Sequence, residues 1–186
     1  MEEILLTDAF RIKVKDNGRK MNIRNVQDRD LLIAHFFHTT ECGCFSASDG
    51  PLRFKIYDTR NHCLWQVEGN MPDTCCGCED SPLSARVVDE AGAVLGTYEG
   101  NEGYYKVMTQ SRDILFIAEK GLLTSTYKIT SRLDGNAEGK ISNKFTFGHI
   151  LSSLKLPPGL SQQHRVLLLI VALEATYKYH ERQQQQ

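Results

Sequence analysis

The chain has 186 residues, a formal net charge of −1 and a pI near 6.6. This length suits one domain that buries roughly two thirds of its unfolded surface, so no disulfide scaffold is needed. The near-neutral charge excludes a generally basic surface, and any attraction to nucleic acid or anionic lipid must therefore be local. The N-terminus, MEEILLTDAF, has the features of neither a secretory signal nor a myristoylation site, which predicts a protein kept on the cytosolic side.

Most of the chain is predicted to form β-hairpins, because apolar residues alternate on both sides of polar turns. The alternation places hairpins at residues 10–26, 52–69, 84–100, 104–121 and 125–142. With a further strand in LLIAHFFH, residues 31–38, about eleven short strands are expected. So many short antiparallel strands in one domain predict a sandwich or a closed barrel.

One helix is expected near the C-terminus, after the chain break at Pro157-Pro158-Gly159 and with Ser161 as its N-cap. Its middle, Val166 to Leu173, is apolar on every face, so it lies either in a protein core or in lipid. A bilayer span needs ~20 apolar residues, and it would place Glu174 in hydrocarbon at a cost of ~2.5 to 3.5 kcal/mol. We therefore expect a core helix wrapped by the strands, with a membrane-spanning helix as the alternative.

Three motifs occur along the chain in an order that matches a known family. LRFKIYDTRNHCLWQV precedes the cysteine-rich TCCGC, VLGTYEGN follows, and YKITSRLDGNAEGKISNKFT contains a GKIS strand followed by basic and aromatic residues. From about Phe10 to Tyr179 the chain resembles the phospholipid scramblases. The resemblance implies a mainly β, tubby-like (LURP-one-related) fold, in which a twelve-stranded antiparallel barrel closes around one buried hydrophobic C-terminal helix.

The resemblance implies one barrel domain at 10–182, between a short N-terminal lead at 1–9 and a polar tail at 183–186. It also implies ATP-independent, bidirectional movement of phospholipids across the plasma membrane, with the protein held peripherally on the cytoplasmic face. The proline-rich N-terminal segment of the well-known scramblases is not in this sequence, so partners that read such segments are not expected. The alternative is a non-transporting module of the same fold in the cytosol and nucleus, which recognises phosphoinositide, a protein or DNA.

Calcium binding, which the resemblance also implies, conflicts with the residues present. Where the family has an acidic calcium-binding segment, this chain reads FGHILSSLKLPPGLSQQHR, and residues 139–173 contain no carboxylate. A calcium site needs six to eight hard oxygen ligands, usually including carboxylates. Calcium is therefore not expected to bind in this segment.

Four basic residues are interleaved with apolar ones in the same region. Near a bilayer surface, each basic group attracts anionic lipid by ~1 kcal/mol. This predicts a site for a lipid headgroup or another partner, with anionic lipid preferred. The alternative is that the apolar residues are core and the cations solvate a strand edge. The four residues are Lys140, Lys144, Lys155 and Arg165.

Five of the six cysteines lie in two clusters, ECGC and TCCGC. Adjacent cysteines bridge poorly and cytosolic disulfides are rare, so thiols, metal ligands or acylated thiols remain. The resemblance implies S-acylation (palmitoylation) of Cys75, Cys76 and Cys78, and two or more acyl chains hold a protein stably on a membrane. Zinc held by Cys42, Cys44, Cys75 and Cys78 is a weaker alternative, because structural zinc sites prefer two to four residues between paired ligands. Thiols without a functional role are the third possibility.

Motifs for bond-making chemistry are missing from the sequence. It contains no G-x-S-x-G elbow, no H-E-x-x-H and no P-loop. GTYEGNEG is glycine-rich, but it lies between two expected strands and lacks the spacing of a dinucleotide loop. We therefore expect no catalytic site. The resemblance to scramblases implies membrane phospholipid as the main partner.

Overall fold

The computed structural model describes residues 7–37, 52–70, 83–101, 103–133, 135, 137–146 and 149–185. Twelve β-strands and one long helix form this part of the chain. The strands are β1 (Ala9–Lys15), β2 (Lys20–Arg24), β3 (Asp30–Phe36), β4 (Leu52–Asp58), β5 (Cys63–Asn70), β6 (Leu83–Asp89), β7 (Val94–Gly100), β8 (Tyr104–Met108), β9 (Ile114–Lys120), β10 (Thr126–Ser131), β11 (Glu138–Thr146) and β12 (His149–Lys155). The helix is α2 (Gln162–Gln185), and a short 3-10 turn, η1 (Asp16–Gly18), connects β1 to β2.

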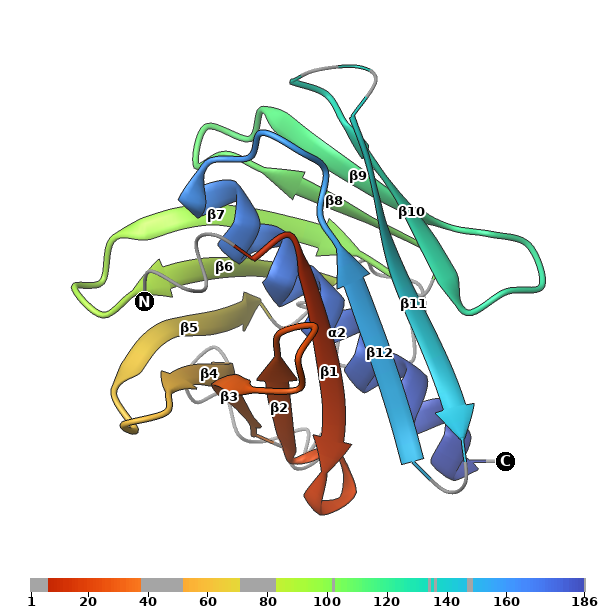
Figure 1. Ribbon diagram of the computed structural model, residues 1–186. Coiled ribbons are helices and arrows are strands. Elements are labelled where there is room, and N and C mark those ends of the chain that lie inside the picture. Colours follow the sequence, from red (N-terminus) through yellow and green to blue (C-terminus); the bar gives the residue numbers. More distant parts are fainter. Residues whose placement is uncertain are drawn as a thin grey trace, which may run out of the picture.

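The strands form one closed antiparallel barrel in which each strand pairs with its neighbours in sequence (Figure 1). Pairing between β1 and β12 closes the ring, with Ala9 opposite Lys155 and Lys13 opposite Leu151. Closure leaves no sheet edge with unpaired backbone groups. The predicted twelve-stranded antiparallel barrel is confirmed.

Alternation alone predicts eleven strands, and β12 is the strand that it leaves out. Its residues alternate between exposed and buried positions, but Ser152 occupies an inward position where an apolar residue is usual. The Ser152 hydroxyl donates a hydrogen bond to Asn143 Oδ1 at 2.6 Å, so the two buried polar side chains satisfy each other. Two adjacent serines therefore hide a strand from hydrophobic pattern analysis.

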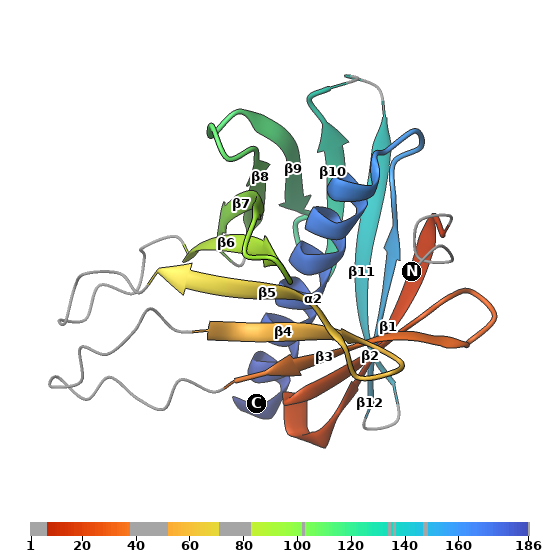
Figure 2. The ribbon, with the colours of Figure 1, turned by 90° about the vertical axis from the view of Figure 1, so that its left-hand side faces the viewer.

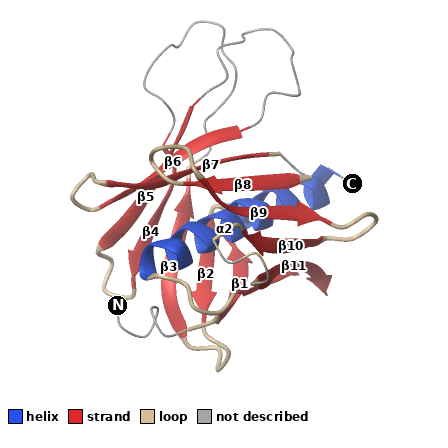
Figure 3. Cartoon of the chain, turned by 90° about the horizontal axis from the view of Figure 1, so that it is seen from above, coloured by secondary structure: helices blue, strands red, loops and turns tan. Residues whose placement is uncertain are grey.

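Helix α2 runs through the middle of the barrel, with strands on both sides of it (Figures 2 and 3). Twelve consecutive residues, Val166–Tyr177, are buried. The Ser161 hydroxyl accepts a hydrogen bond from the His164 backbone N–H at 3.3 Å, as expected of an N-cap. The expected core helix is confirmed. Within the described residues, no helix combines the length and the apolar character that crossing a bilayer requires.

Two glycines of the sequence motifs lie where the barrel wall approaches other elements closely. A Cβ added at Gly96 on β7 would lie 2.7 Å from the Met108 carbonyl oxygen and 2.9 Å from Leu167 on α2. A Cβ at Gly139, in the GKIS motif, would lie 2.7 Å from the Lys155 carbonyl oxygen. These positions need glycine because any side chain would push the wall away from its neighbours.

Strand β4 contains an irregularity that turns a charged side chain inward. Its pairing with β5 shifts between Leu52 and Phe54, so Arg53 has no partner of its own in the register. The Arg53 side chain packs over Gly69 on β5, where a Cβ would lie only 2.7 Å from its Cδ. The guanidinium can therefore reach Glu174 on α2, which is fully buried.

Because consecutive strands run in opposite directions, the turns between them lie alternately at the two ends of the barrel. At one end, η1 connects β1 to β2, the turn at 121–125 connects β9 to β10, β11 stops, β12 starts, and the last turns of α2 emerge (Figure 1). We call this the exit end. The opposite end holds the start of α2 and the turns that follow β2, β4, β6, β8 and β10.

Candidate functional site

The three predicted lysines lie on the outer face of β11 and β12. Lys140 on β11 is directly opposite Lys155 on β12. Nearer the exit end, Lys144 is opposite Leu151 on β12, and Leu151 is in turn opposite Lys13 on β1. Barrel closure therefore adds a lysine from the N-terminal strand to the predicted group. We call these four lysines, together with Leu151, the basic wall.

Within the described residues, the lysines of the basic wall form no ion pair with a neighbouring acid. Lys140, Lys144 and Lys155 are exposed, and none of the four lysines forms an ion pair with another described residue. Like charges directly opposite each other on a sheet are destabilising. The wall is therefore a surface whose electrostatic free energy falls when an anion or an anionic surface binds to it.

Two large apolar side chains lie exposed beside these lysines. Leu151 has 46% of its surface exposed and Phe145, near the end of β11, has 53%. Single exposed apolar residues are common on proteins and need no explanation. Here both lie beside lysines that form no ion pair with another described residue. This combination suits the interfacial region of a bilayer, which is charged at its surface and apolar beneath.

A second basic row continues around the barrel, and sequence analysis did not identify it. Lys15 on β1 is opposite Lys20 on β2, Lys20 is opposite His35 on β3, and His35 is opposite Lys55 on β4. Desolvation and the nearby Lys20 ammonium lower the pKa of His35. The alternating order of FRIKVK and FKIY places Lys15 and Lys55 on outer faces. Only the strand pairing shows that the residues of this row are neighbours.

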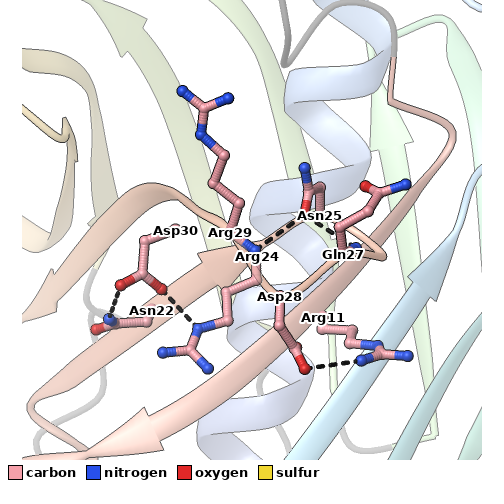
Figure 4. A network of polar contacts seen from close by, with 8 residues as sticks. All are labelled: Arg11, Asn22, Arg24, Asn25, Gln27, Asp28, Arg29 and Asp30. Carbon is pink, nitrogen blue, oxygen red and sulfur yellow. Dashed lines mark hydrogen bonds and ion pairs between the residues drawn. The ribbon is translucent and has the colours of Figure 1, made fainter.

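Acidic residues neutralise two arginines on β1 and β2, the strands that carry parts of these rows (Figure 4). Asp30 accepts hydrogen bonds from Arg24 Nε at 2.6 Å and from Asn22 Nδ2 at 3.2 Å. Arg11 pairs with Asp28 at 3.1 Å. Burial alone would raise the pKa of Asp30, but its bonds to Arg24 and Asn22 outweigh this effect and lower it. In the described part of the chain, these acids form ion pairs with arginines and not with the lysines of the two rows.

The loop that presents Asp28 is held by its own first residue. The side-chain oxygen of Asn25 accepts hydrogen bonds from the backbone N–H groups of Gln27 and Arg29, each at 3.0 Å (Figure 4). Asp28 itself has a φ of 62°, in the left-handed region that aspartate tolerates better than most residues. The loop is thus built to hold the carboxylate against Arg11.

Arg165, the fourth predicted basic residue, lies away from the wall, at the start of α2. Its Nη1 pairs with Asp8 at 2.8 Å and also donates to the Thr7 carbonyl oxygen at 3.0 Å, while its Nε donates to the Leu160 carbonyl oxygen. Only 13% of its side chain is exposed. These contacts hold the segment before β1 against the start of the helix, so we leave Arg165 out of the basic wall.

The cysteines predicted to carry acyl chains or zinc lie outside the described residues; they are Cys42, Cys44, Cys75, Cys76 and Cys78. Of the strands that flank these two segments, β3 and β5 end at the exit end, and β4 and β6 begin there. Cys63, on β5, is a free, partly buried thiol whose pKa is raised by burial. In the part of the chain that the structure describes, no group of three or more His, Cys, Asp or Glu residues is arranged to hold a metal ion.

The fold and surface together define a closed antiparallel β-barrel with a central helix and an outer wall whose lysines form no ion pair with another described residue. No protein-family model matches the chain, and no curated protein matches its sequence. The fold is similar to the X-ray structure of a protein from Arabidopsis thaliana, with a TM-score of 0.57 over 94% of this chain and 95% of that chain. The two sequences are only 8% identical, so this likeness shows the fold alone.

Proposed function

We propose that the protein docks reversibly on anionic membrane surfaces through the basic wall. The observation that carries this proposal is the row Lys144, Leu151 and Lys13 across β11, β12 and β1, in which two unpaired cations flank an exposed apolar side chain. Cations that repel one another in the free protein are attracted to the negative potential of an anionic leaflet. The exposed leucine can enter the interface between them.

The expected strength of this docking follows from the number of charges. At ~1 kcal/mol per basic group near the membrane surface, four lysines supply about 4 kcal/mol. That free energy corresponds to a dissociation constant of about 1 mM, which is weak. The wall alone would therefore give transient contact, and residence on a membrane needs a second contribution.

S-acylation of Cys75, Cys76 and Cys78, which the resemblance to scramblases implies, would supply such a contribution. Each acyl chain adds ~0.8 kcal/mol per buried CH₂, and two chains anchor a protein where one does not. Replacing all three cysteines with alanine should move the protein from the membrane fraction to the soluble fraction of cells that produce it. An unchanged membrane fraction would remove acylation at this cluster from the proposal.

Movement of phospholipids between leaflets is the second candidate function, and the resemblance to scramblases favours it. Because α2 fills the barrel interior, a lipid that crosses would have to move along the outer surface or through bilayer that the protein perturbs. Purified protein reconstituted in liposomes with labelled lipid tests this function. Transfer of label between leaflets supports it, and vesicle binding without transfer, with and without calcium, rejects it.

Substitution of the wall lysines tests the docking proposal. Lys140→Gln, Lys144→Gln and Lys155→Gln together should abolish co-sedimentation with vesicles of phosphatidylcholine and phosphatidylserine, because glutamine keeps the chain polar but removes the charge. A matched control removes the same number of charges from other parts of the barrel, with Lys106→Gln, Arg112→Gln and Arg132→Gln. If both triple variants lose binding equally, net charge explains the attraction and the wall is not the docking site.

A further inference from the structure

The turn between β9 and β10 presents two leucines to solvent. Leu122 is 94% exposed and Leu123 is 107% exposed, the largest values among the exposed large apolar residues of the described chain. The turn is closed by hydrogen bonds from the Gly121 N–H to the Thr126 carbonyl oxygen at 2.9 Å and from the Thr124 N–H to the Gly121 carbonyl oxygen at 3.3 Å. Both leucines therefore occupy the central positions of a tight turn, at its tip.

Leucine is an unfavourable residue at this place in the fold. Central turn positions favour Gly, Asn, Asp and Pro, and Leu123 has a φ of 59°, in the left-handed region that a leucine side chain disfavours. Neither leucine is part of the hydrophobic core, so neither repays this cost by packing. Residues that are unfavourable for the turn and add no packing to the folded protein indicate a contact with another molecule.

The leucine turn adjoins the exit end of the barrel and the end of the basic wall. At the last residue of the turn, before β10, the Ser125 hydroxyl donates to the Asn143 carbonyl oxygen of β11 at 2.5 Å, one residue before Lys144. A shallow cleft at the tip is lined by Leu122, Leu123 and the last turns of α2, including Gln183. Gln183 also lines a second cleft, whose other residues include Lys13, Lys15, Phe145 and His149.

Basic residues lie beside this apolar tip. Lys120 directly precedes the turn and lines the same cleft as the leucines. Neither Lys120 nor the lysines at the exit-end part of β11 and β1 form an ion pair with another described residue; the latter are Lys13, Lys15 and Lys144. An apolar protrusion beside basic side chains matches the layered chemistry of an anionic bilayer, with charge at the surface and acyl chains below.

We propose that Leu122 and Leu123 insert into the boundary between headgroups and acyl chains of an anionic bilayer, so that the barrel docks on the basic wall with the leucine turn beside it also in the membrane. This inference rests on the proposed docking function and adds its orientation and its apolar anchor. A second copy of the chain is a poorer occupant, because pairing two exit ends would bring the lysines of both copies together. Charge complementarity thus favours the lipid surface.

Removal of the two leucines tests the anchor. Leu122→Ser with Leu123→Ser should weaken binding to vesicles of phosphatidylcholine and phosphatidylserine on the order of tenfold, because the buried apolar area is lost and the charges remain. The matched control is Leu133→Ser, which removes a leucine that is 56% exposed in the turn after β10, at the opposite end of the barrel. Equal binding of wild type and the double variant would overturn the inference.

The depth of insertion gives a second readout that does not depend on affinity. The only tryptophan of the chain, Trp65, is 6% exposed, so its emission should not respond to vesicles. A Leu122→Trp variant should show a blue shift on vesicle addition and quenching by lipids brominated along the acyl chain, whereas Leu133→Trp should show neither. Unchanged emission of the Leu122→Trp protein while it is bound to vesicles would overturn the inference.

The same experiments separate failure of this inference from failure of the docking proposal. If the wild type binds no anionic vesicle, both fail. If the Lys140, Lys144 and Lys155 triple variant loses binding but the leucine double variant keeps it, docking stands and the leucine anchor is wrong. If the double variant instead loses self-association in sedimentation velocity, with vesicle binding unchanged, the leucines serve contact between copies and the inference is also overturned.

Discussion

Arg53 and Glu174 form an ion pair inside the barrel, although one lies on a strand of the wall and the other on the central helix. Arg53 Nε donates to Glu174 Oε2 at 3.2 Å, Arg53 Nη2 pairs with Oε1, and the Tyr98 hydroxyl donates to Oε2 at 3.1 Å. Burial alone would lower the pKa of Arg53, but Glu174 and Tyr98 raise it above its usual value. The network keeps the guanidinium charged and fixes the position of α2 along the barrel.

Removing one partner of this pair should destabilise the barrel strongly. Glu174→Gln leaves the Arg53 charge without its counter-ion in a largely buried site, and breaking a buried pair in this way costs about 3 to 5 kcal/mol. Urea unfolding, followed by far-ultraviolet circular dichroism, measures the loss as a lower midpoint at unchanged slope. Tyr98→Phe removes a single hydrogen bond to the carboxylate and should cost less, about 1 to 2 kcal/mol.

A double substitution shows whether the penalty comes from the unpaired charge. Arg53→Met with Glu174→Met removes both charges and should be more stable than Glu174→Gln alone, because well-packed apolar residues often replace a buried pair without loss. If the double variant loses as much stability as Arg53→Met and Glu174→Met lose together when made singly, the two residues act independently. The ion pair would then not be what positions the helix.

Close packing of the wall on α2 predicts a cost for adding one methyl group. Gly96→Ala would place a Cβ against the Met108 carbonyl oxygen and Leu167, and such overpacking typically costs about 1 to 3 kcal/mol. The matched control is Gly135→Ala, where a Cβ meets no atom within 4 Å. Thermal unfolding of both variants should show a lower midpoint for Gly96→Ala only.

Charge reversal on the basic wall should change stability and membrane binding in opposite directions. Lys140→Glu would place an acid directly opposite Lys155 on β12 and Lys128 on β10, and opposite-charge cross-strand pairs contribute about 0.2 to 1 kcal/mol. The variant should unfold at a higher urea concentration yet bind anionic vesicles more weakly. Lys144→Glu, opposite Leu151, should weaken binding without the gain in stability.

His164 should make the barrel less stable in mild acid. Burial lowers the pKa of His164, near the start of α2. Its ring packs edge-on against the ring of Phe116, with the two ring centroids 5.5 Å apart. Because the folded pKa is below the unfolded value of about 6.5, its contribution to stability is present above that value and is lost as pH falls through the folded pKa. His164→Gln should reduce the loss of stability between pH 7 and pH 5. An identical loss in both proteins would assign the acid sensitivity to other groups.

Much of the architecture could be predicted from local pattern. Alternation identified the hairpins, and the all-round apolar run of residues 166–173 identified the core helix, because both signals come from neighbouring residues. The inward ion pair could not be predicted, because it depends on an irregular pairing near Arg53 and on a partner from the distant C-terminal helix. Glu174 could be recognised in the sequence only as an obstacle to a membrane span, not as half of a pair.

The candidate surface was predicted in part for the same reason. Lys140, Lys144 and Lys155 lie close together in the sequence and share the outer face of two paired strands. Lys13 joins them only because β1 closes the barrel against β12. Arg165 is close to them in sequence but faces the segment before β1, where Asp8 binds it. Which cations share a surface thus depends on strand pairing, which composition does not encode.

Vesicle binding of the wild-type protein as a function of lipid charge and salt tests the central claim most directly. We predict co-sedimentation with vesicles that contain phosphatidylserine, little with pure phosphatidylcholine, and a steep loss of binding as salt rises from about 0.05 to 0.5 M, because screening weakens exposed charges. Equal binding to both kinds of vesicle, or binding to neither, would contradict the account.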